Sequence, residues 1–268
     1  MDLHTVGSLR AARTRDDLRL APGEAVLGGG SWLFSEPQLS VSGLVDLTTM
    51  GWEPWTIHAG GLSVSATCTI AQLLEPPAPE DWTAAPLFRQ CAEAFLMSFK
   101  IWNTATVGGN LCLALPAGAM ISLATGLDAE ALIWTPDGGE RREPVATFVH
   151  GVQSTSLQPG EVLRSVEFPL DALQGRASFR TMALTPLGRS SAVVTARLGR
   201  DGRTTLGLTA ATTRPHVFHF GQPPTDDAVQ RALATVDDWY DDAHGAPDWR
   251  AAVSLGLAYE VCEELRAS

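Results

Sequence analysis

The chain has 268 residues, of which 45% are hydrophobic and 18% are charged, a composition typical of a globular protein with a substantial buried core. Its formal net charge is −11, so its surface repels phosphate backbones and we expect no nucleic-acid partner. Met1–Asp17 is mixed and polar, so we expect no secretory signal. The most apolar stretch, Leu113–Leu127, is short and interrupted by Pro116, so we expect no membrane span. We therefore expect a cytoplasmic location.

The chain begins with the pattern of a small αβ unit. Two short apolar runs, Ala25–Leu27 and Leu44–Leu47, predict strands, and the polar stretch Thr14–Leu20 is expected to be the helix of this unit. After a break at Gly51–Pro54, the turn Gly60–Gly61 predicts a hairpin between strands, which we place at Thr56–Ala59 and Leu62–Thr67.

The middle of the chain predicts helices followed by strands. Leu87, Cys91, Phe95 and Phe99 recur every four residues, which predicts one helix over Leu87–Lys100. A short helix is expected before it and a second one after Pro116, followed by two strands; the ranges are Thr69–Leu74, Ala117–Leu127, Ala129–Thr135 and Val162–Phe168.

The last third changes to alternating apolar and polar residues, which predicts antiparallel strands at Arg176–Leu184, Ser191–Leu198 and Thr204–Ala211. Helices are expected to follow at Asp226–Trp239 and Arg250–Arg266.

A glycine motif, Leu27-Gly28-Gly29-Gly30-Ser31-Trp32, directly follows the first predicted strand. Glycines allow a backbone turn whose N–H groups converge on one point, a concavity that suits a phosphate, and Ser31 adds a hydroxyl donor. A plain tight turn is the alternative interpretation. The spacing fits neither the dinucleotide fingerprint of a Rossmann fold nor a P-loop, because Leu33 stands at the third glycine position and no Gly-Lys-Ser/Thr follows.

A second motif of small residues, Thr106-Val107-Gly108-Gly109-Asn110, lies between two predicted helices. Small residues let a flat aromatic ligand or a pyrophosphate approach the backbone, and Thr106 and Asn110 can donate hydrogen bonds. A helix crossover that needs small residues for packing is the alternative. Two tryptophans, Trp32 and Trp102, border the motifs and are candidates for stacking on a flat aromatic ligand.

Three other groups of residues could carry chemistry. The cysteines, Cys68, Cys91, Cys112 and Cys262, are widely separated without a C-x-x-C pair, which argues against zinc and against an iron–sulfur cluster held by this chain. His216 and His219 are expected on opposite faces of a strand, so no metal site is predicted. The carboxylates at Asp237, Asp238, Asp241 and Asp242 are expected to form a solvated acidic face. No serine–histidine or cysteine–histidine arrangement stands out, so no catalytic residue is assigned.

Seven segments occur in one order along nearly the whole chain: Leu27–Ser31, Leu44–Leu47, Thr106–Asn110, Pro116–Ala117, Leu127–Glu130, Gly139–Arg141 and Pro159–Leu163. This order resembles the FAD-binding subunit of the xanthine dehydrogenase and carbon monoxide dehydrogenase family of molybdenum hydroxylases. Asp248–Arg250 is similar to the Tyr-Arg element that opens the last helix of the family. The chain departs from the family at Trp102, where arginine is usual, and at Ala119, where aspartate is common.

The resemblance implies an α+β fold of the vanillyl-alcohol-oxidase (PCMH) type. Two αβ subdomains, residues 1–53 and 54–172, would hold FAD between them, and a C-terminal antiparallel sheet and helix subdomain would follow at 173–268. It implies that Leu27–Trp32 and Thr106–Asn110 contact the cofactor, with Val107 near the isoalloxazine. The FAD is expected to be non-covalent, because neither motif holds a histidine or cysteine within it.

The family also implies partners. Its members receive electrons from an iron–sulfur subunit, while a third subunit binds the molybdopterin cofactor, so the chain is expected to be the FAD-dependent oxidoreductase subunit of a molybdopterin dehydrogenase. The acidic C-terminal third is expected to form part of the partner contact. Two alternatives stay open: a stand-alone FAD oxidoreductase, and a scaffold that keeps the fold without flavin.

Overall fold

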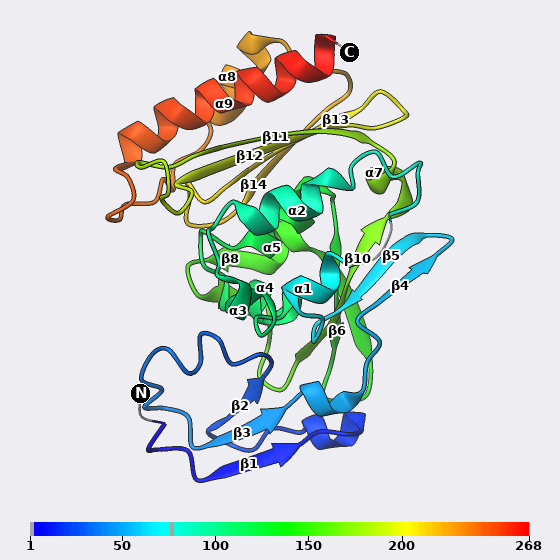
Figure 1. The fold of residues 1–268 in the computed structure, drawn as a ribbon, viewed down its shortest axis with the longest axis vertical. Coiled ribbons are helices and arrows are strands. Elements are labelled where there is room, and N and C mark those ends of the chain that lie inside the picture. The colour runs from blue at the N-terminus through cyan, green and yellow to red at the C-terminus, as the bar shows by residue number, and fades with distance from the viewer. Residues whose placement is uncertain (1–2, 76–77, 268) are drawn as a thin grey trace.

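The computed structural model describes residues 3–75 and 78–267, in which three larger sheets follow one another in chain order beside a small two-stranded sheet (Figure 1). The first is a three-stranded parallel sheet in which β3 pairs with both neighbours; its strands are β1 (Ser8–Ala11), β2 (Glu24–Leu27) and β3 (Gly43–Asp46). β2 and β3 confirm the predicted strands. β1 was not predicted, because its exposed sequence Ser-Leu-Arg-Ala lacks an apolar pattern.

The helix expected at Thr14–Leu20 is wrong. The segment forms a single 3₁₀ turn, η1 (Arg15–Leu18), because the Asp17 carboxylate accepts hydrogen bonds from the backbone N–H of Arg13 and Thr14 and closes the turn on itself. Only Leu18 of this turn is buried, too little apolar surface to stabilise a longer helix.

The second sheet is antiparallel with the order β4-β5-β10-β6-β7. Its strands are β4 (Trp55–His58), β5 (Gly61–Ser65), β6 (Glu130–Trp134), β7 (Glu140–Pro144) and β10 (Val162–Pro169). The helices between β5 and β6 fill the main core together with this sheet; they are α1 (Ile70–Leu73), α2 (Pro86–Glu93), α3 (Phe99–Trp102), α4 (Val107–Leu113) and α5 (Ala119–Gly126). Shorter elements complete this part: α6 (Val145–Phe148), β8 (Val149–Gly151), β9 (Ser154–Thr155) and α7 (Leu170–Leu173).

The single helix expected over Leu87–Lys100 is also wrong. α2 ends at Glu93, Leu96 adopts a left-handed backbone with φ 51°, and Ser98 caps the separate turn α3 by accepting from the Ile101 N–H. The four-residue periodicity therefore does not place Phe99 in the core, and its side chain is 73% exposed.

The third sheet is antiparallel with the order β11-β12-β13-β14; the strands are β11 (Arg176–Met182), β12 (Ala192–Leu198), β13 (Thr204–Thr209) and β14 (His216–Phe220). Figure 1 shows α8 (Asp226–Leu233) and α9 (Pro247–Ala267) over one face of this sheet, with α2 and α5 beneath the other. α8 is shorter than the predicted Asp226–Trp239, because the chain after Leu233 leaves the helix and Tyr240 N–H bonds to the carbonyl of Ala211. No helix of residues 3–75 and 78–267 is long and apolar enough to cross a membrane.

The expected acidic face is wrong for two of its four carboxylates. Asp238 accepts hydrogen bonds from Thr213 Oγ1 (2.6 Å) and pairs with His216 Nε2 (2.5 Å). Asp242 pairs with the buried Arg250 and, at 3.0 Å, with Arg189. These carboxylates fasten the segment before α9 to the third sheet.

Candidate flavin site

The fold brings the two glycine motifs into direct contact. A Cβ atom built on Gly29 would lie 1.5 Å from the carbonyl oxygen of Thr104, and one built on Gly28 would lie 2.9 Å from Thr106 Oγ1. The first loop therefore lies against the segment that leads into α4 so closely that no side chain fits between them. The two motifs are therefore neighbours in the fold.

The first loop presents backbone donors that the chain itself does not use. Three of its carbonyl groups accept hydrogen bonds: Leu27 from Leu47 N–H at 2.9 Å, Gly30 from Phe34 N–H at 2.9 Å and Trp32 from Ser35 N–H at 2.7 Å. Among the described residues, however, the N–H groups from Gly28 to Trp32 donate no hydrogen bond. Successive backbone N–H groups without a partner in the chain are the kind of donor set that suits an anion such as a pyrophosphate.

The conformation of this loop depends on glycine at a second point. Gly30 has φ +68°, and a Cβ atom there would also meet the ring of Phe34 at 2.4 Å. The turn is thus fixed by the loop's own residues before any ligand binds.

The second motif is the first turn of α4 and not a loop between helices. Thr106 is its N-cap and accepts from Gly109 N–H at 3.0 Å, while Val107 and Gly108 donate to the carbonyls of Cys68 and Ala66 at 2.8 and 2.9 Å. The backbone N–H groups from Val107 to Asn110 are therefore satisfied within the chain, unlike those of the first loop.

Only part of the second motif reaches the surface. Thr106, Val107 and Gly108 are buried, whereas Gly109 is exposed and Asn110 is half-buried. Asn110 Oδ1 accepts from Met120 N–H at 2.9 Å, which orients the amide so that Nδ2 remains a donor without a partner among the described residues. Gly109 and Asn110 are thus the accessible portion of the motif.

The indole of Trp102 adds an unpaired donor beside the second motif. Trp102 Nε1 is buried and has no hydrogen-bond acceptor in the described part of the chain. Buried polar groups are nearly always hydrogen-bonded, so this N–H fits an acceptor supplied from outside the chain. Trp32, in the first loop, is half-buried.

Cation–aromatic contacts join the first sheet to the second. The Arg164 guanidinium lies 4.2 Å from the ring centre of Trp52 and 5.6 Å from that of Trp134, and Arg15 lies 4.6 Å from the Trp134 ring centre. Burial lowers the pKa of Arg164. These contacts hold the N-terminal unit, and with it the first glycine loop, in place. Nothing in the sequence pattern singled them out.

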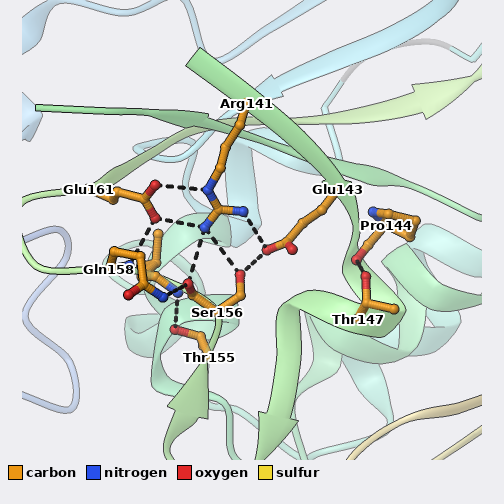
Figure 2. Close-up of polar contacts among 9 residues, drawn as sticks. Arg141, Glu143, Pro144, Thr147, Thr155, Ser156, Gln158 and Glu161 are labelled. Atoms are coloured by element: carbon orange, nitrogen blue, oxygen red, sulfur yellow. Dashed lines mark hydrogen bonds and ion pairs between the residues drawn. The ribbon is translucent and has the colours of Figure 1, made fainter. Parts of the chain in front are cut away.

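Figure 2 shows a polar cluster that unites two segments of the sequence resemblance, Gly139–Arg141 and Pro159–Leu163. Arg141 donates from Nε and Nη2 to the two oxygens of Glu161 at 2.8 and 2.7 Å, and its Nη1 lies 3.1 Å from Glu143. The hydrogen bonds from Arg141 lower the pKa of Glu161 and raise that of the arginine. The cluster ties β7 to the start of β10 and has no free catalytic group.

Comparison with known proteins agrees with the resemblance seen in the sequence. Residues 10–171 match the FAD-binding domain of molybdopterin dehydrogenases. Among solved structures, quinoline 2-oxidoreductase from Pseudomonas putida 86 is similar at 24% identity and a TM-score of 0.79, covering 96% of this chain and 95% of that one. No match was found among curated proteins.

Two carbon monoxide dehydrogenases have a similar fold. The enzyme from Hydrogenophaga pseudoflava that lacks the Mo-pyranopterin moiety is 16% identical with a TM-score of 0.83, and the reconstituted enzyme from Oligotropha carboxidovorans is 19% identical with a TM-score of 0.83. In both comparisons 98% of each chain is covered. The expected fold, two αβ parts followed by an antiparallel sheet with helices, is confirmed.

Proposed function

The chain belongs to the family of FAD-binding domains of molybdopterin dehydrogenases, and we propose that it is the electron-transfer subunit of a molybdenum hydroxylase. In this role it receives electrons from an iron–sulfur partner and passes them through FAD to an acceptor, while a molybdopterin-binding partner oxidises the organic substrate. The complex is a cytoplasmic hetero-oligomer. Bound FAD supplies the redox chemistry; the residues of this chain bind and orient it.

The cofactor contacts in this proposal are the two motifs, Leu27–Trp32 and Thr106–Asn110. The observation that carries it is the set of unused N–H groups from Gly28 to Trp32 beside the accessible turn at Gly109. These donors fit the pyrophosphate of a dinucleotide. The unpaired Trp102 indole fits a further acceptor atom of the cofactor.

The division into subdomains is part of the same proposal. Residues 1–53 hold the three-stranded sheet, 54–172 the five-stranded sheet and 173–268 the four-stranded sheet, and the glycine contacts lie between the first two. FAD would then bind where these two subdomains meet, as ligands often do at domain interfaces.

Purification from the native source tests the function. We expect a yellow complex with iron–sulfur and molybdopterin chains, whose flavin is reduced by an organic substrate only when those chains are present, and whose flavin is released by acid. If the isolated chain is reduced directly by a small organic substrate, the protein is a stand-alone oxidoreductase. A colourless chain that takes up no FAD would be a scaffold.

A further inference from the structure

A half-buried arginine on the second sheet is aimed by an irregularity of its strand. In the pairing of β10 with β6 the register shifts between Leu163 and Ser165, so Arg164 is the extra residue of a β-bulge. Bulges re-aim a side chain relative to the regular alternation of a strand. The guanidinium of Arg164 lies 4.2 Å from the ring centre of Trp52 and 5.6 Å from that of Trp134. The bulge thus holds a cation against two aromatic rings.

The guanidinium of Arg164 donates no hydrogen bond and forms no ion pair within the described part of the chain. The carboxylate that interacts with it electrostatically, Glu167, is engaged elsewhere. It accepts from Ser63 Oγ at 2.9 Å and from Ser165 Oγ at 2.5 Å, and it lies 3.8 Å from His58 Nε2. A guanidinium that packs against aromatic rings can still donate a pair of N–H bonds to a carboxylate or phosphate. Arg164 therefore offers a charge and donors that these residues leave unused.

The two tryptophans add donors of the same kind. Both are half-buried, and their rings lie edge to face with centres 5.4 Å apart. Among residues 3–75 and 78–267, neither indole N–H has a hydrogen-bond acceptor. Indole and guanidinium groups donate hydrogen bonds and accept none. Trp52, Trp134 and Arg164 therefore form a set of donors without acceptors, which suits an anion and not a cation.

The local charge is positive although the chain carries a formal charge of −11. A second guanidinium, that of Arg15, lies 4.6 Å from the ring centre of Trp134. It donates to the carbonyl oxygens of Thr135, at 3.4 Å, and of Gly139, and not to a carboxylate. Two cations thus contact one ring, and neither is neutralised by an ion pair in the segments that the structure describes. Such a concentration of positive charge attracts an anion.

A cavity gives access to this group of residues. Arg15 and Trp134 line a cavity of about 870 Å³ between η1 and the turn that joins β6 to β7. Its volume is in the range of small-molecule sites. The carboxylates on its wall are engaged: Asp16 pairs with Arg19 at 3.1 Å, and Asp137 accepts hydrogen bonds from its own turn. An anion can therefore approach Trp134 from the cavity without meeting an unpaired carboxylate.

We propose that Arg164, Trp52 and Trp134 form a binding site for a small oxyanion, which carries either a phosphate or a carboxylate group. The site is separate from the first glycine loop, whose N–H groups are proposed to bind the pyrophosphate of FAD. Trp52 follows the first sheet, whereas Trp134 and Arg164 lie on strands of the second, so a bound anion would bridge the two sheets. Its binding would therefore stabilise the folded chain.

The test measures the thermal unfolding midpoint of the full chain with inorganic phosphate or acetate added, while sodium chloride keeps the ionic strength constant. A site with a Kd of about 1 mM should raise the wild-type midpoint by about 3 °C at about 10 mM phosphate. Phosphate also stabilises proteins through the solvent, but that contribution is common to all variants. The readout is therefore the difference in this rise between wild type and variant.

Three variants separate the site from a general effect of charge. Arg164→Met keeps an apolar stem against the rings but removes the donors, so most of the rise should be lost. Arg164→Lys keeps the charge without the planar fork and should retain only part of the rise. Arg142→Met is the matched control, because Arg142 is an exposed arginine of the same sheet, on β7, without a ring contact in the described residues. It should show the wild-type rise.

The probes also identify the ligand class and the results that contradict the site. A rise with phosphate alone indicates a phosphate ligand, and a rise with acetate indicates a carboxylate. Equal rises in wild type and Arg164→Met, or an equal loss in Arg142→Met, would overturn the inference. So would a phosphate effect that disappears when FAD is bound, together with weaker FAD binding by Arg164→Met, because the guanidinium would then bind the cofactor's own phosphate. If Arg164→Met does not fold, Arg164→Lys decides the outcome. No partner chain is needed, so failure here leaves the proposed function standing.

Discussion

Substitutions at the two neighbouring glycines at the start of α4, Gly108 and Gly109, are expected to separate an effect on flavin binding from an effect on folding. A Cβ atom on Gly109 would have only one neighbour within 4 Å, Thr106 Oγ1 at 2.9 Å. A Cβ atom on Gly108 would lie 2.5 Å from Ala66 Cβ and 2.7 Å from the Ala66 carbonyl oxygen. We therefore expect Gly109→Val to remove flavin from a folded chain, and Gly108→Ala to damage the fold.

The magnitudes follow from these contacts. Displacing Thr106 Oγ1 would weaken the N-cap of α4 by about 1 kcal/mol, and replacing a helical glycine recovers roughly 0.5 to 1 kcal/mol, so Gly109 variants should keep their stability to within about 1 kcal/mol. Gly108→Ala overpacks a contact with backbone and should cost about 1 to 3 kcal/mol. A valine at the exposed position 109 would, however, occupy the surface where FAD is proposed to lie.

The assay measures flavin per chain by absorbance after release in acid, together with the thermal unfolding midpoint. Gly109→Val should bind at least about tenfold less FAD, a loss of about 1.4 kcal/mol or more, with a near wild-type midpoint. Gly109→Ala provides a smaller step at the same position. Full flavin occupancy in Gly109→Val would refute the placement of FAD against this turn.

Other predictions follow from the same contacts. Gly29→Ala places a Cβ atom 1.5 Å from the Thr104 carbonyl oxygen, so the loop must shift; FAD affinity should fall about tenfold or more in a titration and the thermal unfolding midpoint should fall as well; wild-type affinity would mean that the loop contact is dispensable. Trp102→Phe removes the unpaired buried N–H, so FAD should bind about two- to tenfold more weakly while the flavin-free chain is no less stable; unchanged affinity would mean that the cofactor does not accept this bond. Arg141→Met removes the cation from the buried Glu161 carboxylate and leaves it the Gln158 N–H as donor, which should cost about 1 to 3 kcal/mol at neutral pH. Because the folded pKa of Glu161 is lowered, that contribution is present above its unfolded pKa of about 4.3 and is lost as pH falls through the folded value. Denaturant unfolding should thus show a smaller difference between wild type and Arg141→Met at about pH 3.5 than at about pH 7, and an equal difference would contradict this pairing.

The sequence predicted the fold correctly where one pattern of apolar residues extends over a whole strand or helix. Strands with a buried face, such as β5 and β12, and the long helix α9 lie close to their expected positions. Edge strands such as β1 and β7 escaped prediction because their side chains are mostly exposed and carry no apolar period.

The predicted helix lengths were wrong where a local interaction outweighs the apolar period. The period through Leu87 and Phe99 continues across Leu96, but the left-handed turn there and the Ser98 cap start a new element. α8 stops early because the segment after it pairs with the connection between β13 and β14. Single-sequence periodicity cannot detect either competition.

The two motifs of the candidate site could be identified from the sequence, but their contact with each other could not. Nothing local in the sequence indicates that Gly29 packs on the Thr104 carbonyl, since this contact depends on how two parts of the chain assemble. The sequence also does not show that the backbone N–H groups of the first loop are unpaired while those of Val107 and Gly108 are hydrogen-bonded. The carbonyl groups of Cys68 and Ala66, which accept those two bonds, are distant in sequence.

Titration of the flavin-free chain with FAD and with FMN tests the central claim most directly. If the N–H groups from Gly28 to Trp32 bind the pyrophosphate, FAD should bind tightly and FMN, which lacks that group's second phosphate and the adenosine, far more weakly. Equal binding of the two flavins, or no binding of either, would contradict it.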